Sequence, residues 1–173
     1  MKAFIIVGHT GRGKSAFSKK LIEQLKRSHP ALIYDVNNEY GVGHLPDWDE
    51  FLELAADEKQ TRQRLILFEE ATIFFSSAKS KLMTSILVRK RHTKNIPVLL
   101  FHSLADVPPY ILRFVDFLIL FKTNDNPGAI YDKFKYNDQL IGAYERVKAS
   151  KTGTCECKQK HPPGFHYSEI IKL

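Results

Sequence analysis

The chain has 173 residues, of which 43% are hydrophobic and 26% are charged, which suits one domain with its own core and argues against disorder. The longest apolar runs, such as FVDFLILF, are too short to span a bilayer, and MKAFIIVG is interrupted too early to be a secretory signal, so we expect a cytoplasmic protein. The formal net charge of +7, from 26 basic and 19 acidic residues, is compatible with a polyanionic partner.

Apolar strands and amphipathic helices alternate along the chain. In chain order we expect strands at 3–7, 31–35, 64–68, 97–102 and 116–121. The helices between them should begin at Lys14, cover 47–57 with Asp47 as N-cap, pass through Leu82, Ile86 and Leu87, and follow the VPP at 107–109. Asn126 and Pro127 look like the cap and first position of one last helix, whose apolar residues are Ile130, Phe134, Ile141 and Tyr144.

Strands that are apolar on both faces, separated by helices, predict an α/β three-layer sandwich with a mainly parallel sheet of five or more strands. Ligands of such sheets bind beyond the carboxyl ends of the strands, so the residues after each strand are the candidates for function. The composition changes near Ala149, which divides the chain into a core of residues 1–148 and a basic tail of residues 149–173 that contains Cys and His.

The segment GHTGRGKS after the first strand fits the phosphate-loop pattern G-x-x-x-x-G-K-[ST] in full. Its glycines let successive backbone amides point at one anion, and the helix that follows adds the positive end of its dipole. Lys14 can reach the β- and γ-phosphates of ATP, and the Ser15 hydroxyl can join a Mg²⁺ shell. The alternative is a glycine-rich turn that binds nothing. The predicted nucleotide-binding residues are Gly8, His9, Thr10, Gly11, Arg12, Gly13, Lys14, Ser15 and Ala16.

Two acids, Glu69 and Glu70, end the third predicted strand. If this strand lies near the first, Glu69 can hold the Mg²⁺ through water and Glu70 can polarise an attacking water as the catalytic base. The alternative is a solvated acidic pair at the end of a strand.

The combination resembles the P-loop NTPases that carry an additional catalytic glutamate, although those usually read Asp-Glu where this chain has Glu-Glu. Three further stretches are similar to segments of the FtsK–HerA group of DNA-pumping ATPases, which includes viral packaging and zonula occludens toxin-like phage assembly members: IYDVNNEY (33–40), RKRHTKNIPVLLFHS (89–103) and LADVPPYILRFVDFLILFKTND (104–125). Together the motifs cover roughly residues 1–130 in order. Where the group commonly has a Gln that senses the γ-phosphate, this chain has His102 and Ser103, and either side chain can take that role or a structural one.

The resemblance implies a ring of subunits in which a neighbour supplies an arginine to the transferring phosphate. Arg91 is the first candidate, with Arg113 and Lys122 as others, each expected on or near the active edge of the sheet. Residues 79–94 hold six Lys or Arg and no acid. They can contact the backbone of double-stranded DNA, or they can form the solvated face of a helix.

The tail contains Cys155, Cys157, His161 and His166. Two thiolates and two imidazoles can bind zinc, but the C-x-C spacing is tighter than in most fingers, and a disordered basic tail is the alternative.

The leading hypothesis is an ATP-hydrolysing motor subunit that moves DNA into a capsid or through a membrane pore, in the host cytoplasm if it is viral. The alternatives are a thymidine kinase-like nucleoside or nucleotide kinase, and an ATP-binding assembly protein with little turnover.

Overall fold

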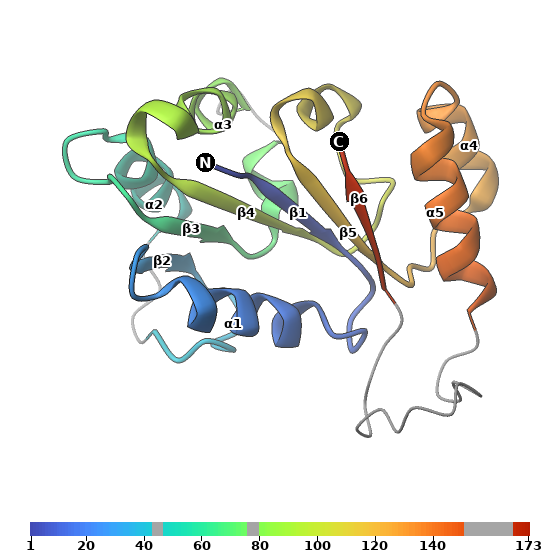
Figure 1. The fold of residues 1–173 in the computed structure, drawn as a ribbon, viewed down its shortest axis with the longest axis horizontal. Coiled ribbons are helices and arrows are strands. Elements are labelled where there is room, and N and C mark those ends of the chain that lie inside the picture. The colour runs from blue at the N-terminus through green and yellow to red at the C-terminus, as the bar shows by residue number, and fades with distance from the viewer. Residues whose placement is uncertain (43–46, 76–79, 151–167) are drawn as a thin grey trace.

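The computed structural model describes residues 1–42, 47–75, 80–150 and 168–173, in which strands and helices alternate as the sequence predicts (Figure 1). The strands are β1 (Phe4–Val7), β2 (Ala31–Tyr34), β3 (Leu65–Phe68), β4 (Ile96–Phe101), β5 (Phe117–Phe121) and β6 (Ser168–Lys172). The α-helices are α1 (Lys14–Leu25), α2 (Trp48–Ala56), α3 (Ser80–Thr93), α4 (Pro127–Phe134) and α5 (Asp138–Ala149). Two short 3₁₀ helices are η1 (Ala71–Phe74) and η2 (Pro109–Phe114).

The strands form one sheet in the order β2-β3-β4-β1-β5-β6. The first five run parallel, and β6 runs antiparallel to β5. Strand β1 is central, because its last residue, Val7, pairs with Phe101 of β4 on one side and Leu120 of β5 on the other. The predicted mainly parallel α/β sheet is therefore confirmed. The carboxyl ends of β1, β3 and β4 lie side by side.

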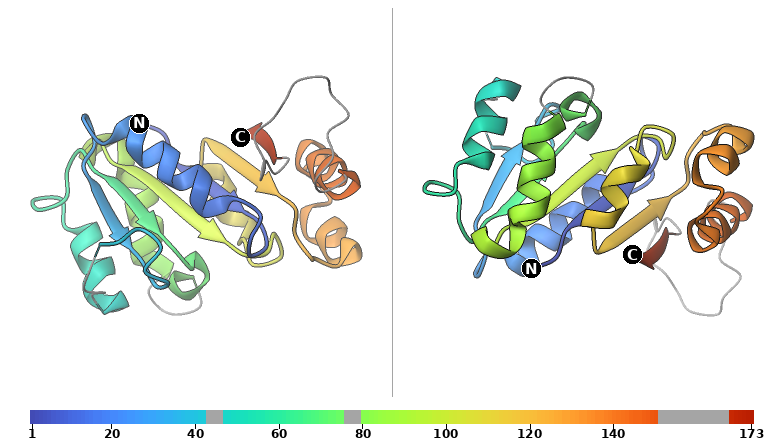
Figure 2. Two further views of the ribbon diagram at one scale, coloured as in Figure 1. Left: turned by 90° about the horizontal axis from the view of Figure 1, so that it is seen from below. Right: turned by 90° about the horizontal axis from the view of Figure 1, so that it is seen from above.

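Helices cover both faces of the sheet, as Figure 2 shows. Helix α1 packs on one face through its predicted apolar residues Phe17, Leu21, Ile22 and Leu25. The other face is covered by α2, α3 and η2, and further along by α4 and α5. A hydrophobic core lies on each face of the sheet, and alternate strand residues pack into one or the other. Ile5 and Val7 belong to the core under α2 and α3, and Ile6 belongs to the core under α1.

Two of the predicted helix caps are confirmed. The side chain of Asp47 accepts a hydrogen bond from Asp49 N, and that of Asn126 accepts one from Gly128 N. The prediction of a single last helix is wrong, because α4 ends at Phe134 and α5 begins at Asp138. Asn137 causes the break, since its side chain accepts a hydrogen bond from Leu140 N and so caps a new helix.

Strand β6 was not predicted from the sequence, although it lies within the segment interpreted as a tail. It pairs with β5 over its whole length and buries Ile171, which is 2% exposed. The described C-terminus therefore closes one edge of the sheet. No helix in the described ranges is both long and apolar enough to cross a membrane.

Candidate nucleotide-binding site

The phosphate loop, residues 8–13, joins the end of β1 to the start of α1 and is fixed to the strands on either side. Gly8 N donates to Phe101 O at 3.1 Å, and His9 N donates to Lys122 O at 3.0 Å. A Cβ atom at Gly8 would lie 2.6 Å from Phe121 Cβ, so no larger residue fits there without movement of the backbone. Gly13 precedes α1 with φ at 94°, a conformation that glycine adopts without steric cost. The first amides of α1, which have no helical acceptor, therefore open onto the site.

Lys14 is 8% exposed, and its ammonium group lies beneath the loop. Its Nζ atom donates to Gly8 O at 2.6 Å and lies 3.3 Å from Nδ1 of His102. Burial lowers the pKa of Lys14, while the charges of Glu70, Glu39 and Glu69 act in the opposite direction. The lysine is thus a buried cation that faces several carboxylates.

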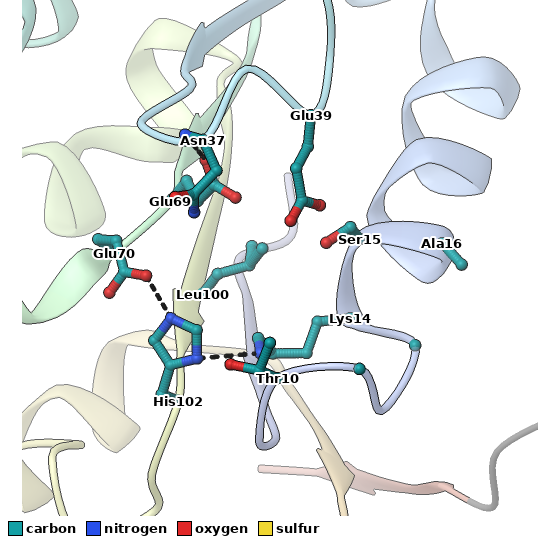
Figure 3. A pocket seen from close by; sticks show the side chains of 12 residues that line it. Thr10, Lys14, Ser15, Ala16, Asn37, Glu39, Glu69, Glu70, Leu100 and His102 are labelled. Carbon is teal, nitrogen blue, oxygen red and sulfur yellow. Dashed lines mark hydrogen bonds and ion pairs between the residues drawn. The ribbon is translucent and has the colours of Figure 1, made fainter.

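A pocket of about 680 Å³ lies at the carboxyl edge of the sheet (Figure 3). Residues from the ends of β1, β2, β3 and β4 and from the start of α1 line it. They are Thr10, Gly11, Gly13, Lys14, Ser15, Ala16, Asn37, Glu39, Glu69, Glu70, Leu100 and His102. The structure therefore brings together most of the predicted nucleotide-binding residues and both acids. Gly8, His9 and Arg12 belong to the loop but are not among the lining residues.

Glu69 is 5% exposed at the end of β3. One of its carboxylate oxygens, Oε2, accepts a hydrogen bond from Asn37 N at 3.2 Å. Burial raises the pKa of Glu69, and the hydrogen bonds from Asn37 lower it in part. Burial of a charged carboxylate is unfavourable unless a cation is near. The burial of Glu69 therefore suits its predicted role as a metal ligand.

Glu70 has a left-handed backbone, with φ at 55° and ψ at 49°, which is uncommon for a residue with a side chain. This conformation ends β3 abruptly and begins η1. The Glu70 carboxylate contacts Nε2 of His102, and Nδ1 of the same imidazole faces Lys14 Nζ (Figure 3). The predicted catalytic acid, the predicted sensor and the phosphate-loop lysine thus form one connected chain of polar groups.

Ser103, the other predicted sensor, has different contacts. Its hydroxyl donates to the carboxylate of Asp125, which also accepts hydrogen bonds from Leu104 N at 2.8 Å and Ala105 N at 3.4 Å. Ser103 is not among the residues that line the pocket. These contacts link the segment after β4 to the segment before α4, so Ser103 has a structural place in the fold.

The three predicted phosphate-contacting cations do not share one edge of the sheet. Arg91 is exposed in the last turn of α3, which leads into the amino end of β4. The nearby Thr93 O accepts a hydrogen bond from Gln63 N, which lies just before β3, so this end of α3 is at the amino edge of the sheet. Arg113 also precedes a strand and stacks on Phe114, with 4.8 Å from its guanidinium carbon to the ring centre. The expectation that these arginines lie at the active edge is wrong, because a helix leading into a parallel strand ends at the opposite edge.

Lys122 does lie at the active edge, directly after β5. Its backbone oxygen holds His9 of the phosphate loop, and its Nζ donates to Ser150 O at 3.3 Å.

The basic segment on α3 is partly engaged within the fold. Lys90 is 8% exposed, donates to Phe114 O and pairs with Asp116 at 3.1 Å, while Arg89 pairs with Glu58. Arg91 and Lys94 remain exposed. The predicted zinc residues Cys155, Cys157, His161 and His166 lie outside the described residues.

Two further polar residues line the pocket, Asn37 and Glu39, and neither is a site residue predicted from the sequence. Both belong to the loop after β2, within the stretch IYDVNNEY that carries part of the family resemblance. The signal that identifies them is their position, since polar residues just after a parallel strand fall at the edge where ligands bind.

The predicted magnesium site is consistent with the oxygen donors of the pocket. Ser15 supplies a hydroxyl and Glu69 a buried carboxylate, and both line the pocket. Mg²⁺ bound with a nucleotide usually takes one or two carboxylates together with phosphate oxygens and several waters. Within the described residues, no three or more His, Cys, Asp or Glu side chains are grouped so that they could hold a metal.

Comparison with known proteins agrees with this geometry. The family model of the central domain of helicase HerA matches residues 2–129. No protein with a curated description matches the chain.

Solved structures of the B204 proteins of two viruses share the fold. The genome packaging NTPase B204 from Sulfolobus turreted icosahedral virus 2, in complex with AMPPCP, gives a TM-score of 0.70 at 21% identity over 87% of this chain and 88% of that chain. Its complex with ATP-gammaS gives a TM-score of 0.69 at 20% sequence identity, and the match covers 87% of each chain. The DNA-packaging ATPase B204 from Sulfolobus turreted icosahedral virus gives a TM-score of 0.70 at 20% sequence identity. The match covers 87% of this chain and 88% of that chain.

The matched family covers the phosphate loop, both acids and all five parallel strands. The kinase alternative loses its support, because the matched model is not that of a kinase. The chain belongs to the family of the helicase HerA central domain and is a P-loop ATPase of the FtsK–HerA type.

Proposed function

We propose that this chain is the motor subunit of a machine that hydrolyses ATP to translocate or package double-stranded DNA. The observation that carries the proposal is the linked set Glu70–His102–Lys14, because it joins an acid suited to water activation with the phosphate-loop lysine. The family membership supports the choice of ATP and of a DNA-linked role. Two of the B204 structures contain ATP analogues, and B204 is described as a DNA-packaging ATPase.

In this proposal the phosphate loop and Lys14 hold the β- and γ-phosphates. Ser15 and Glu69 would hold Mg²⁺, which supplies positive charge against the phosphate oxygens when bound. Glu70 orients a water whose oxygen attacks the γ-phosphorus as the bond to the β-phosphate oxygen breaks. Glu70 accepts the water proton, and the products are ADP and inorganic phosphate. The Nε2 atom of His102 contacts the Glu70 carboxylate, and its Nδ1 atom faces the ammonium group of Lys14, which would bind the phosphates.

The subunits would assemble as a ring, in which a basic side chain of one subunit reaches the pocket of the next. Arg91 remains the first candidate and Arg113 the second, since a residue remote from its own pocket is free to serve a neighbour's. Lys122 is a weaker candidate, because it already binds Ser150 O within its own subunit. Other exposed cations of residues 79–94, such as Lys94, would contact the phosphate backbone of the DNA.

The setting of the motor follows from the same proposal. The core of residues 1–148 would act in the cytoplasm, or in the host cytoplasm if the protein is viral. A capsid or membrane-pore protein would be its partner. Within residues 149–173, β6 belongs to the sheet, and the Cys- and His-containing stretch before it would be an accessory segment for which zinc binding is a hypothesis.

An ATPase assay with and without linear double-stranded DNA, repeated at several salt concentrations, tests the proposal. A motor should hydrolyse ATP faster with DNA, and the stimulation should weaken as salt rises, because backbone contacts release counterions. Light scattering on the same sample should detect an oligomer in the presence of nucleotide. Tight ATP binding with negligible hydrolysis under every DNA condition would favour the low-turnover assembly protein instead.

A further inference from the structure

We infer that Glu39 is a further metal-positioning residue of the nucleotide site, and that its carboxylate joins Ser15 and Glu69 around the divalent cation that accompanies ATP. The inference rests on the proposed function. It adds a third oxygen donor, from the loop after β2, to a site that sequence motifs assign only to the phosphate loop and to the end of β3.

Glu39 lies on the wall of the pocket, together with Ser15 and Glu69. In Figure 3 its carboxylate points across the pocket toward the side where the Ser15 hydroxyl lies. Burial lowers the pKa of Lys14 and raises that of Glu69, and the charge of Glu39 acts upward on both, so Glu39 acts on the cation and on the acid that flank the phosphate position. The Glu39 carboxylate therefore shares the pocket with both groups already expected to hold the metal.

The backbone that carries Glu39 is fixed by a buried acid. Asp35 is 4% exposed, and its two oxygens accept hydrogen bonds from Glu39 N and Tyr40 N, each at 2.8 Å. This arrangement closes the loop into a tight turn directly after β2. It holds the Cα of Glu39 in one place, so that only the side-chain torsions remain free.

The same loop is tied to the two other elements of the site. Tyr40 and Ser18 share a hydrogen bond between their hydroxyl groups at 2.6 Å, which joins the loop to α1 one turn after Ser15. Asn37 N donates to Glu69, which joins the loop to the end of β3. The three proposed donors, Ser15, Glu69 and Glu39, thus stand on elements that are locked together, as metal sites require.

The charges in the pocket favour a cation as the partner of Glu39. Three carboxylates, those of Glu39, Glu69 and Glu70, line the pocket against one lysine. Glu69 binds Asn37 and Glu70 binds His102, whereas the Glu39 carboxylate has no hydrogen-bond or ion-pair partner within the described part of the chain. A free carboxylate beside a triphosphate is repulsive unless a metal ion lies between them.

The test uses the full chain and the variant Glu39→Gln, which removes the charge and keeps the size. Glu23→Gln is the matched control, because Glu23 is an exposed acid on α1 that pairs with Lys26 and does not line the pocket. Binding of a non-hydrolysable ATP analogue is measured by calorimetry during a Mg²⁺ titration and again in excess chelator. For Glu39→Gln we expect the Mg²⁺ affinity of the analogue complex to fall roughly tenfold. Analogue affinity in chelator should stay equal or rise, since a repulsive charge is gone.

Unchanged Mg²⁺ affinity in Glu39→Gln, with a wild-type melting temperature, overturns the inference. So does a loss of turnover at unchanged Mg²⁺ affinity, because Glu39 would then act on water. Equal weakening of analogue binding with and without Mg²⁺ also overturns it, because that result indicates damage to the loop. Failure of the wild-type chain to bind the analogue in Mg²⁺ is a separate result, which contradicts the proposed function itself.

Discussion

The Glu70 carboxylate contacts the His102 imidazole across the ends of the neighbouring strands β3 and β4. The other nitrogen of the ring lies 3.3 Å from the ammonium group of Lys14. The side chain expected to orient water is therefore linked, through one imidazole, to the side chain expected to hold the transferred phosphate. This link gives a physical route by which occupancy of the phosphate site can change the position of Glu70.

Substitution of His102 tests this link. His102→Leu should keep nucleotide binding and lower kcat by at least about tenfold, because Glu70 loses the group that positions it. His102→Gln should retain much of the activity, since an amide can still hydrogen-bond both neighbours. Steady-state ATPase kinetics with a separate binding measurement distinguish the two effects. Equal kcat in all three proteins would show that His102 is structural.

Substitution of Glu69 should separate stability from function. Burial raises the folded-state pKa of Glu69 above its ordinary value, so its charged form destabilises the fold. Glu69→Gln should have little effect on stability below about pH 4, where the acid is protonated in both states. Its benefit should grow as the pH rises from the ordinary pKa of a glutamate to the raised pKa, and it should be complete above the raised pKa.

Thermal unfolding across this pH range measures the effect, at about 2–4 °C for each kcal/mol gained. The same variant should bind Mg²⁺ with nucleotide more weakly. A Glu69→Gln protein that is less stable than the wild type at pH 7 would contradict the account.

The sequence was sufficient for the parts of the site that depend on short-range pattern. The phosphate loop could be predicted because the complete motif lies within the eight consecutive residues GHTGRGKS. Glu69 and Glu70 could be predicted because they directly follow an apolar strand. The pairing of β4 between β1 and β3, which brings His102 between Lys14 and Glu70, depends on strand order, and local pattern does not encode that order. Arg91 lies at the other edge for a different reason, because α3 leads into the amino end of the parallel strand β4 whatever the strand order.

Replacement of Gly8 should be costly because of its contact with the neighbouring strand. A Cβ there would meet Phe121 Cβ at 2.6 Å, so Gly8→Ala should destabilise the protein by about 1–3 kcal/mol and weaken nucleotide binding. Gly142→Ala on α5 is the matched control, since its Cβ would meet only the flexible end of Arg146 at 3.4 Å.

That control should stabilise the protein by about 0.5–1 kcal/mol, because alanine favours a helix over glycine. Urea unfolding with calorimetric nucleotide binding measures both variants. Gly8→Ala with wild-type stability would contradict the packing described for the loop.

Strand β6 can be tested by a pair of adjacent isoleucines. Ile171 is 2% exposed and Ile170 is 62% exposed. Ile171→Ala should lower the free energy of unfolding by about 2–5 kcal/mol. Ile170→Ala should change it by no more than about 0.5 kcal/mol. Chemical denaturation measures both. Similar losses at the two positions would mean that β6 does not pair with β5 in the register found here.

Strand β6 and the break between α4 and α5 are two features that the sequence pattern does not predict. SEIIK is short and follows a Cys- and His-containing stretch of tail-like composition, so its apolar pair does not by itself predict a strand. Asn137 is a good helix cap, but the apolar spacing from Ile130 to Tyr144 fits one continuous helix almost as well. Tertiary packing against β5 and the cap chemistry decide these two cases.

The central claim is that the pocket binds ATP with Mg²⁺ and hydrolyses it with Glu70 as the base. It is tested most directly by Glu70→Gln, measured for ATP affinity and for single-turnover hydrolysis in the presence of double-stranded DNA. The account predicts affinity close to that of the wild type and hydrolysis slower by about 10²-fold or more. Hydrolysis at the wild-type rate in Glu70→Gln would contradict it.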